Sequence, residues 1–455
     1  MNLQIFREYD IRGVVDKDLT PEVVENLGKA FGSRVVRAGC KKVAIGRDVR
    51  LSGDSLFTAL SKGILSTGCD VVDIGRVPTP ILYFSQFHLD VDAGIMITGS
   101  HNPPEFNGFK LLLKKEGMWG KEIQEIAKEI QKGAHEKGSG AISSVDVINP
   151  YIEMVKSKIK LSRKIKMVID SGNGCGGLAA PRLFREMGCE VVELFSEPDG
   201  LFPNHHPDPT VLKNTLRLRE EVVKQKAELG IGYDGDADRI GIVDEKGNLL
   251  YGDQALMIFA RDLLSRRKGG KVIFDVKCTS NLPDYVRRFG GTPIMSATGH
   301  SIIKQRMHDE QAELAGEMSA HIFFAEDYFG YDDALFATAR ILKILDTASG
   351  PVSSFLADVP HMHSTPEIRV DCPDDLKFGI VKELVEYYRG KYEVIDIDGV
   401  RIDFGGGWGL IRASNTGPVL VLRFEAKSLE DLERYQREVH AKLISFPPLA
   451  SLKPF

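Results

Sequence analysis

Short apolar runs alternate with longer amphipathic stretches along most of the chain, and the alternation repeats. A buried strand, a turn of small or polar residues and the start of a helix are predicted at 41–53, 165–177 and 270–282. A helix end closed by glycine and a second strand follow at 66–75, 186–195 and 288–297. A third strand recurs at 90–100, 226–236 and 311–319. The pattern predicts three similar β-α-β-α-β units of about 100 residues each.

The pattern changes after Ser364. A strand and turn, an amphipathic helix at Leu376–Tyr388, several short strands within 391–426 and a final helix at Leu429–Leu443 are predicted there. The predicted fold class is therefore α/β, with parallel or mixed sheets in three similar domains and a C-terminal α+β domain. The expected boundaries are 1–146, 147–250, 251–362 and 363–455.

Composition narrows the class of protein. The 455 residues are too many for one hydrophobic core, and a formal net charge of −5 offers no broad cationic surface for nucleic acid. The six cysteines show no C-x-x-C pair, which is typical of reduced thiols. The first residues show no export signal, and no apolar run is long enough to span a bilayer. We expect a cytoplasmic protein with neither a nucleic-acid nor a membrane partner.

Three unusual loops follow the third strand of the three units. They read TGSHNP (98–103), DGDADR (234–239) and GEMSAH (316–321). Ligands of open α/β sheets bind outside the carboxyl ends of the strands. We therefore expect these loops to face one central cleft between the domains.

Ser100 and His101 stand side by side in the first loop, which resembles part of a serine-hydrolase site. Adjacent residues on an extended chain point to opposite sides, so we expect His101 to be poorly placed to deprotonate Ser100. No G-x-S-x-G elbow surrounds the serine either. A turn or helix cap is the simpler alternative for Ser100 alone.

The second loop alternates three carboxylates, Asp234, Asp236 and Asp238, which can converge on one hard cation. Glu245 stands where an EF-hand has its bidentate glutamate, but Arg239 replaces the required glycine and the flanking segments are predicted strands. The positive guanidinium of Arg239 would repel a bare cation, but it suits the site if a phosphate bridges it to the metal. The loop predicts a metal site that favours Mg²⁺ over Ca²⁺.

Two further segments add polar side chains. GEMSAH places Glu317, Ser319 and His321 on alternate positions, which suits hydrogen bonding to several hydroxyls, and a polar loop without a ligand is the alternative for this segment alone. RASNTGP (412–418) gathers an arginine, hydroxyls and an amide, which suits a phosphate. Lys277 and His300 are single cationic or titratable candidates, and a plain surface position is the alternative for either. Together the loops indicate a phosphorylated, polyhydroxylated substrate, with Ser100 as a phosphoryl carrier.

The four loops, in this order and spacing, resemble those of the α-D-phosphohexomutases, and within them the bacterial phosphomannomutase/phosphoglucomutase group. The resemblance covers essentially the whole chain. It implies a phosphoserine domain I, a metal-binding domain II, a sugar-binding domain III and a TATA-binding-protein-like, phosphate-binding domain IV. It also implies interconversion of hexose 1-phosphate and hexose 6-phosphate, of mannose or glucose, through phospho-Ser100 and a bound hexose 1,6-bisphosphate. One Mg²⁺ per chain is implied.

The resemblance also implies roles for individual residues. The metal ligands are Asp234, Asp236, Asp238 and Ser100 through its phosphate. The catalytic set is Ser100, His101, Lys110, Arg12, Arg239 and His321, with Lys110 and His321 as candidates for the general acid and base. The substrate-binding set is Tyr9, Lys277, His300, Glu317, Met318, Ser319, Ala320, His321, Arg412, Ala413, Ser414, Asn415 and Thr416. Ala320 departs from a common glycine, and Gly417 follows the threonine of the phosphate loop.

Two alternatives remain open. A phosphoglucosamine mutase is the nearest within the family, although its sugar loop typically carries glutamine where this chain has Met318. A noncatalytic, metal-dependent sugar-phosphate binding protein is the alternative from another class. The expected partners are small phosphosugars, and we expect a monomer or a weak dimer.

Overall fold

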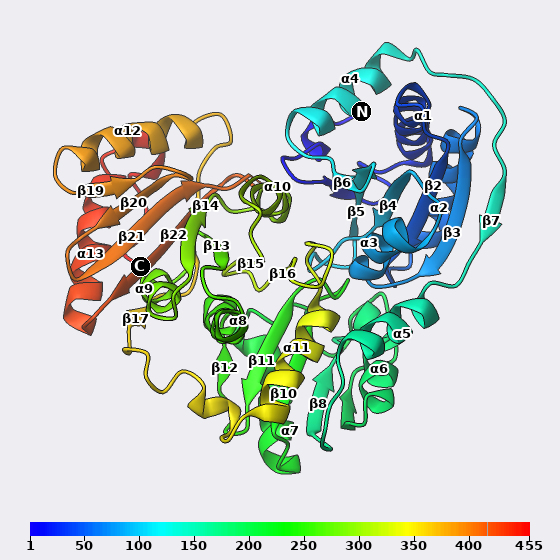
Figure 1. Cartoon of the computed structure of the whole chain (residues 1–455). Helices are drawn as coiled ribbons and strands as arrows, with labels where there is room; N and C mark the ends of the chain where they lie inside the picture. The colour runs from blue at the N-terminus through cyan, green and yellow to red at the C-terminus, as the bar shows by residue number, and fades with distance from the viewer. Residues whose placement is uncertain (416) are drawn as a thin grey trace. The chain divides into compact units, whose positions relative to one another are not determined.

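The computed structural model describes residues 1–415 and 417–455 (Figure 1). The chain divides into two compact units. Unit 1 contains Met1–Ala255 and Ser319–Phe355, and unit 2 contains Leu256–Met318 and Leu356–Phe455. Helix α8 (Gly252–Arg266) carries the chain from the first unit into the second.

The first sheet of unit 1 is built around β2, which pairs in parallel with β3 on one side and β4 on the other. The sheet continues from β4 to the antiparallel β5 and then β1, and β7 pairs with β3 at the other edge. Its strands are β1 (Ile11–Val14), β2 (Lys42–Arg47), β3 (Asp70–Arg76), β4 (Ala93–Ile97), β5 (Phe106–Leu113), β6 (Glu116–Gly117) and β7 (Ile142–Ser144). Its helices are α1 (Pro21–Arg37), α2 (Gly53–Leu65), α3 (Thr79–His88) and α4 (Lys121–Lys132).

Every residue of β4 is buried, which explains why this strand is a continuous apolar run rather than an alternating one. Helix α1 begins where Thr20 caps the main-chain N–H of Val23 and Pro21 occupies the first turn. Apolar residues of α1, α2 and the central strands form one core cluster beneath the sheet. The strand ends are therefore held on a rigid base.

The second sheet of unit 1 repeats this plan with β8 at the centre, β9 and β10 parallel on either side, and β11 antiparallel beyond β10. Its strands are β8 (Lys166–Asp170), β9 (Glu190–Leu194), β10 (Leu229–Tyr233), β11 (Ile240–Asp244) and β12 (Leu249–Leu250). Its helices are α5 (Ile148–Lys158), α6 (Ala180–Glu186) and α7 (Leu216–Gln225). Unit 1 also contains β16 (Ile322–Phe324) and α11 (Ala334–Thr347), which Asp333 caps.

Unit 2 contains the third copy, in which β13 (Lys271–Asp275) pairs in parallel with β14 (Thr292–Ser296) and β15 (Leu314–Gly316). Helices α9 (Asn281–Arg288) and α10 (His300–Glu310) connect these strands. In all three copies the first strand is central and the third strand lies beside it. The prediction of three similar β-α-β-α-β domains is confirmed.

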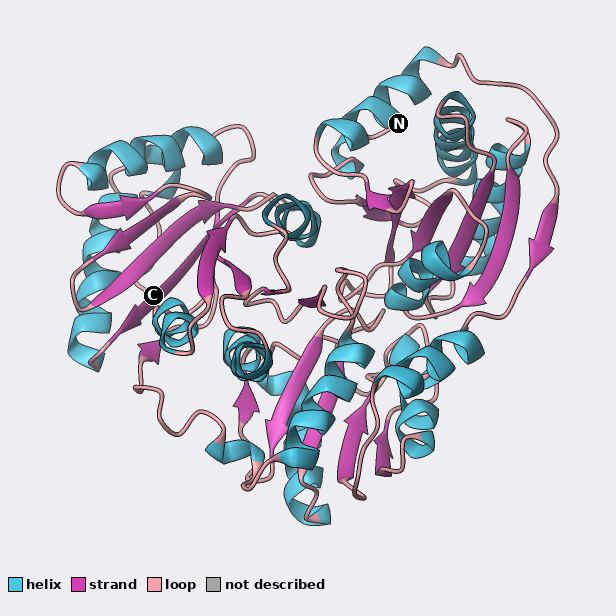
Figure 2. Cartoon of the chain, in the orientation of Figure 1, coloured by secondary structure: helices cyan, strands magenta, loops and turns pink. Residues whose placement is uncertain are grey.

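The C-terminal part of unit 2 is an antiparallel sheet on which two helices pack (Figure 2). The strands are β17 (His363–Ser364), β18 (Ile368–Asp371), β19 (Glu393–Ile395), β20 (Val400–Asp403), β21 (Gly407–Ala413) and β22 (Val419–Ala426). The helices α12 (Lys377–Arg389) and α13 (Leu429–Leu443) share one apolar core with the sheet. The predicted change to an α+β domain after Ser364 is confirmed. Within the described residues, no helix combines the length and apolar character of a membrane span.

Helices α1 and α2 cross at a glycine contact that leaves no room for a side chain. A Cβ atom on Gly63 would lie 2.1 Å from the main-chain oxygen of Glu25. We expect Gly63→Ala to lower the free energy of unfolding by about 1–3 kcal/mol because the two helix backbones must separate. Urea unfolding of the variant measures this change.

Gly379→Ala is the matched control, because Gly379 also lies inside a helix, α12, and a Cβ there would meet no atom within 4 Å. Alanine should raise the stability at this position by up to about 1 kcal/mol. Equal unfolding midpoints for the two variants would contradict this prediction, because they would show that α1 and α2 can move apart without loss of stability.

Candidate functional site

Ser100 lies in the loop between β4 and β5, almost fully buried at 3% exposure. Its Oγ lies 3.0 Å from Asp234 Oδ2 and 3.1 Å from Nδ1 of His101. The backbone of Ser100 is left-handed, with φ +47°, a conformation that costs free energy in a residue other than glycine. The loop thus holds the hydroxyl against a carboxylate of another sheet.

The expectation that His101 points away from Ser100 is wrong. It assumed an extended chain, in which adjacent side chains alternate, whereas the left-handed turn at Ser100 places the imidazole beside the hydroxyl. Burial, followed by the nearby Arg239 and Arg12, holds the pKa of His101 well below its ordinary value. The ring is therefore neutral at neutral pH and able to exchange a proton.

Three carboxylates converge directly after β10. Asp234, Asp236 and Asp238 are fully buried, and one oxygen from each lies within 4.8 Å of the others. Thr79 Oγ1 donates to Asp236 Oδ2 at 2.6 Å, while Asp236 Oδ1 has no hydrogen-bond partner among the described residues. A buried carboxylate oxygen that lacks a hydrogen-bond partner is suited to bind a hard cation. We interpret the cluster as a metal site.

Glu245 takes no part in this cluster. Its carboxylate accepts hydrogen bonds from the main chain and hydroxyl of Ser353 at 3.1 and 2.5 Å, and strands β10 and β11 flank the acidic loop. The arrangement therefore differs from an EF-hand, as the Arg239 position in the sequence predicts.

Cationic side chains from three segments surround the carboxylates. Lys110, on β5, contacts Asp238 and lies 3.5 Å from Asp236. Arg12, on β1, donates to Asp10 and to the main-chain oxygen of Gly99. Nε of Arg239 lies 3.9 Å from Asp234 Oδ2. These charges can offset those of the carboxylates and of a phosphate on Ser100.

Mutual interaction shifts the pKa values of this cluster in opposite directions. Burial, and then Asp238 and Asp236, raise the pKa of Asp234 well above its ordinary value. Burial also opposes the charged form of Asp238, but Lys110 and His321 outweigh it and hold that pKa well below the usual range. For Lys110, burial favours the neutral amine, but Asp236 and Asp238 outweigh it and raise the pKa well above its ordinary value.

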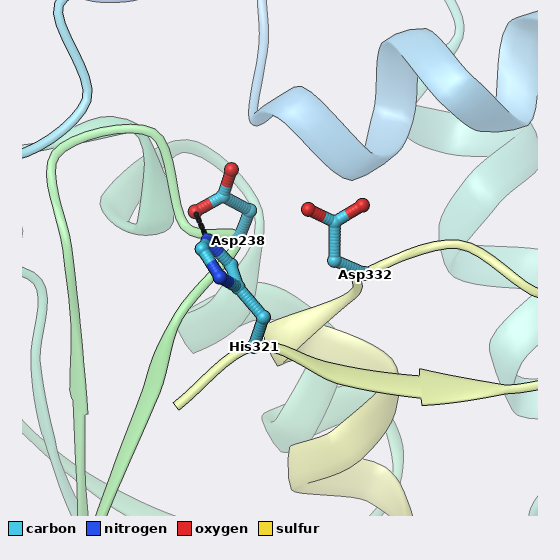
Figure 3. Close-up of side chains that lie close together, drawn as sticks. All are labelled: Asp238, His321 and Asp332. Atoms are coloured by element: carbon cyan, nitrogen blue, oxygen red, sulfur yellow. Dashed lines mark hydrogen bonds and ion pairs between the residues drawn. The ribbon is translucent and has the colours of Figure 1, made fainter. Parts of the chain in front are cut away.

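His321 lies directly before β16, with its ring beside Asp238 (Figure 3). Nε2 lies 3.2 Å from both Asp238 Oδ1 and Arg239 Nε, and Nδ1 lies 3.3 Å from Ser319 Oγ. A main-chain bridge joins Arg239 to His321, which fixes this approach. Asp332 also lies near Asp238 and His321, and one potential ligand atom from each of the three residues lies within 4.8 Å of the other two.

Unit 2 brings three of the predicted sugar-binding segments together near Asp275, at the end of β13. Asp275 Oδ1 accepts from the main-chain N–H groups of Lys277 and Met318 at 3.2 and 3.3 Å. Glu317 accepts from the main-chain N–H of Gly299, directly before His300, at 2.7 Å. The loops after β13, β14 and β15 therefore meet at one edge of this sheet.

Lys277 Nζ forms an ion pair with Glu367 at 2.9 Å. The positive charge of Lys277 lowers the pKa of Glu367 to about 2, against the opposing effect of burial. The lysine is thus kept charged and oriented before any substrate arrives.

Arg412, the last but one residue of β21, is held in a similar way. Its Nε donates to Asp398 Oδ2 at 2.9 Å, and the same oxygen accepts from the main-chain N–H of Thr298 at 3.0 Å. Ser414 follows the strand and accepts from the main-chain N–H of Gly417 at 3.2 Å. Asp398 therefore ties the predicted phosphate loop to the loop that precedes His300.

The remaining predicted residues are placed as follows. Tyr9 lies half-buried before β1, Ala413 ends β21, Asn415 is partly exposed, and Thr416 lies outside the described residues. Ala320 is buried with φ +70°, the region where glycine is free of strain. Ser319, Ala320 and His321 belong to unit 1, whereas Glu317 and Met318 belong to unit 2.

Sequence reasoning missed several polar residues that hold these loops, among them Asp48, Arg50, Asp332, Glu367 and Asp398. Two signals could have found some of them. Asp48 and Arg50 are charged residues directly after a buried strand, and Asp332 stands in an acidic pair before a helix. Glu367 and Asp398 carry no comparable local signal.

Comparison with known proteins gives full-length matches. Family models described as phosphoglucomutase/phosphomannomutase alpha/beta/alpha domains I, II and III match residues 3–137, 149–247 and 251–362, and the model of the C-terminal domain matches 367–442. The chain belongs to the phosphoglucomutase/phosphomannomutase family.

Individual members of the family are similar over nearly their full length. The phosphomannomutase/phosphoglucomutase of Pseudomonas aeruginosa is 45% identical over 94% of this chain and 93% of that protein. The phosphoglucomutase of Neisseria gonorrhoeae is 43% identical over 98% of each chain. The crystal structure of a family protein from Burkholderia thailandensis superposes with a TM-score of 0.94, at 42% identity and full coverage of both chains.

We expect Asp236→Asn to weaken divalent-cation binding by about tenfold or more, because a charged ligand is lost while the amide preserves shape and the Thr79 contact. Calorimetric titration with Mn²⁺ measures the dissociation constant. Asp170→Asn is the matched control: Asp170 is also buried at the end of a strand, β8, but pairs with His205. Equal Mn²⁺ affinities of the parent and Asp236→Asn would contradict the metal assignment.

Proposed function

We propose that the chain is a phosphohexomutase that interconverts hexose 1-phosphate and hexose 6-phosphate, with mannose and glucose as substrates. The contact of the Ser100 hydroxyl with Asp234, at the edge of the buried carboxylate cluster, is the observation that carries the proposal. Similarity to proteins named phosphomannomutase/phosphoglucomutase supports the choice of substrates.

In the proposed reaction, phospho-Ser100 donates its phosphoryl group to the free hydroxyl of a bound hexose monophosphate. The bond from phosphorus to Ser100 Oγ breaks as the bond to the sugar oxygen forms. The sugar hydroxyl loses one proton, and the freed Ser100 oxygen gains one to become a hydroxyl. The resulting hexose 1,6-bisphosphate turns over and returns its other phosphoryl group to Ser100. The net reaction moves phosphate between C1 and C6 and leaves the enzyme phosphorylated.

Asp234, Asp236 and Asp238, together with a phosphate oxygen on Ser100, are the residues that would hold Mg²⁺. When bound, Mg²⁺ withdraws negative charge from the transferring phosphoryl group. Two features fit this ion: all the donor atoms are oxygens, and Asp236 Oδ1 has no hydrogen-bond partner in the part of the chain that the structure describes.

Lys110 and Arg239 stabilise the negative charge that spreads over the phosphoryl oxygens during transfer. The raised pKa of Lys110 keeps it protonated, which favours this electrostatic role over that of a base. His101, whose Nδ1 lies 3.1 Å from Ser100 Oγ, is placed to exchange the serine proton. We assign His321, beside Asp238, to the proton of the sugar hydroxyl.

Residues of unit 2 carry the groups that suit the non-reacting parts of a hexose phosphate. Glu317 and Lys277 suit the sugar hydroxyls, and Arg412 with Ser414 suits the phosphate that stays bound. The bond from Nε to Asp398 fixes the plane of the Arg412 guanidinium, and a planar guanidinium is suited to bidentate recognition of phosphate. One such pocket serves either isomer, because each presents one phosphate away from the reacting end.

The test of function is a coupled assay with glucose 1-phosphate, mannose 1-phosphate and glucosamine 1-phosphate, together with the intact mass of the protein. We expect turnover of the glucose and mannose esters. The intact mass of the parent protein should include a phosphoryl group, and the mass of Ser100→Ala should lack it. Preference for glucosamine 1-phosphate would identify the alternative mutase. Binding without turnover or phosphorylation would identify a noncatalytic sugar-phosphate binding protein.

We expect Arg412→Ala to weaken binding of the 1-phosphate and the 6-phosphate alike. Loss of a charge-assisted hydrogen bond costs about 1.5–3 kcal/mol, or roughly ten- to more than a hundredfold in Kd. Calorimetry with both isomers measures the change, and Arg434→Ala, which removes an exposed arginine of the same domain, is the control. Selective loss of one isomer would show that two separate phosphate pockets exist.

A further inference from the structure

The loop that carries Ser100 closes around one arginine. Arg50 follows β2, and its side chain is fully buried. Nη2 donates to the main-chain oxygens of Ser100 and Asn102 at 2.8 and 2.6 Å. Nη1 donates to the main-chain oxygens of Pro103 and Phe106 at 2.5 and 2.9 Å. The guanidinium thus gathers four carbonyl groups from one short segment.

The fifth donor of Arg50, Nε, pairs with Asp48 Oδ2 at 3.1 Å, so every N–H of the guanidinium has a partner. The same carboxylate oxygen accepts from Thr98 Oγ1 at 2.8 Å and from the main-chain N–H of Gly99 at 3.0 Å. Thr98 Oγ1 in turn accepts from the main-chain N–H of Ser100 at 2.8 Å. Asp48 and Arg50 therefore bind the loop on both sides of the serine.

Close packing completes this arrangement. A Cβ atom on Gly99 would lie 2.3 Å from Cζ of Arg50, so the guanidinium packs directly against the loop backbone. The guanidinium also lies over the ring of Phe202, with Cζ 5.1 Å from the ring centroid. These contacts can offset the cost of the left-handed conformation at Ser100.

We propose that Arg50, oriented by Asp48, is the positioning residue that holds Ser100 Oγ in line with the carboxylate cluster for phosphoryl transfer. The proposal rests on the proposed function. Arg50 contacts the loop through main-chain oxygens, so its effect reaches the reacting atoms through the backbone of Ser100. A lysine cannot replace it, because one ammonium group lacks the five planar N–H donors that bind the four loop carbonyls and Asp48.

Arg50→Lys and Asp48→Asn test the proposal, with Arg47→Lys as the matched control. Arg47 lies at the end of the same strand and pairs with Asp54 and Asp73 instead of the loop. We expect Arg50→Lys to lower kcat by about a hundredfold, the effect of a misplaced reacting group, with KM little changed. Asp48→Asn should also lower kcat, and Arg47→Lys should leave kcat and KM unchanged.

Hydrogen exchange measured by mass spectrometry follows the loop independently of activity. The N–H of Asn102 donates to Gly99 O at 2.9 Å and that of Phe106 to Pro103 O at 3.0 Å, so a peptide across this loop reports its closure. We expect faster exchange in this peptide alone for Arg50→Lys and Asp48→Asn.

Parental kcat and parental loop exchange in Arg50→Lys would overturn the proposal. Faster exchange throughout unit 1 in both variants would also overturn it, since the pair would then serve general folding. A parent protein without mutase activity would refute the proposed function instead, and the loop exchange would still decide whether Arg50 holds the loop.

Discussion

Mutual repulsion among three buried carboxylates is the constraint on which the rest of unit 1 depends. Asp234, Asp236 and Asp238 have no solvent to screen them, so each needs a cation or a donor from elsewhere in the chain. Lys110 and His321 contact Asp238, Thr79 donates to Asp236, and Ser100 donates to Asp234, all from distant segments of the chain. The acidic loop thereby joins the two sheets of unit 1 and the strand that follows residue 319.

The topology of the repeats explains how such distant residues meet. In each copy the third strand lies beside the first and ends at the same edge of a parallel sheet, so its loop projects from that edge. In unit 1, two such edges bring Ser100 into contact with Asp234. In unit 2, the corresponding edge gathers Glu317, Lys277 and the segment before His300 around Asp275.

Much of the fold could be predicted from the sequence because it rests on local periodicity. The final helix, for example, has the predicted bounds Leu429–Leu443, since Ser428 caps it and apolar residues recur along one face. The alternating aspartates were equally visible, because their spacing is itself the signal.

What could not be predicted depends on backbone dihedrals and on long-range partners. The side on which His101 lies follows from one left-handed residue, Ser100, which no local pattern marks. The partners of Arg50 are carbonyl oxygens about fifty residues away, and main-chain acceptors leave no trace in the sequence. The role of Asp398 could not be predicted either, because its partners are a main-chain N–H and an arginine in two different loops.

The left-handed residue after the third strand has a consequence for protein design. Ser100, Ala237 and Ala320 each adopt positive φ within four residues of the end of β4, β10 or β15. One backbone turn thus presents a serine hydroxyl, a group of carboxylates or a polar loop, according to the side chains placed on it. A designer can graft new chemistry onto this scaffold by exchanging side chains at the turn, provided that the left-handed position is retained or given to glycine.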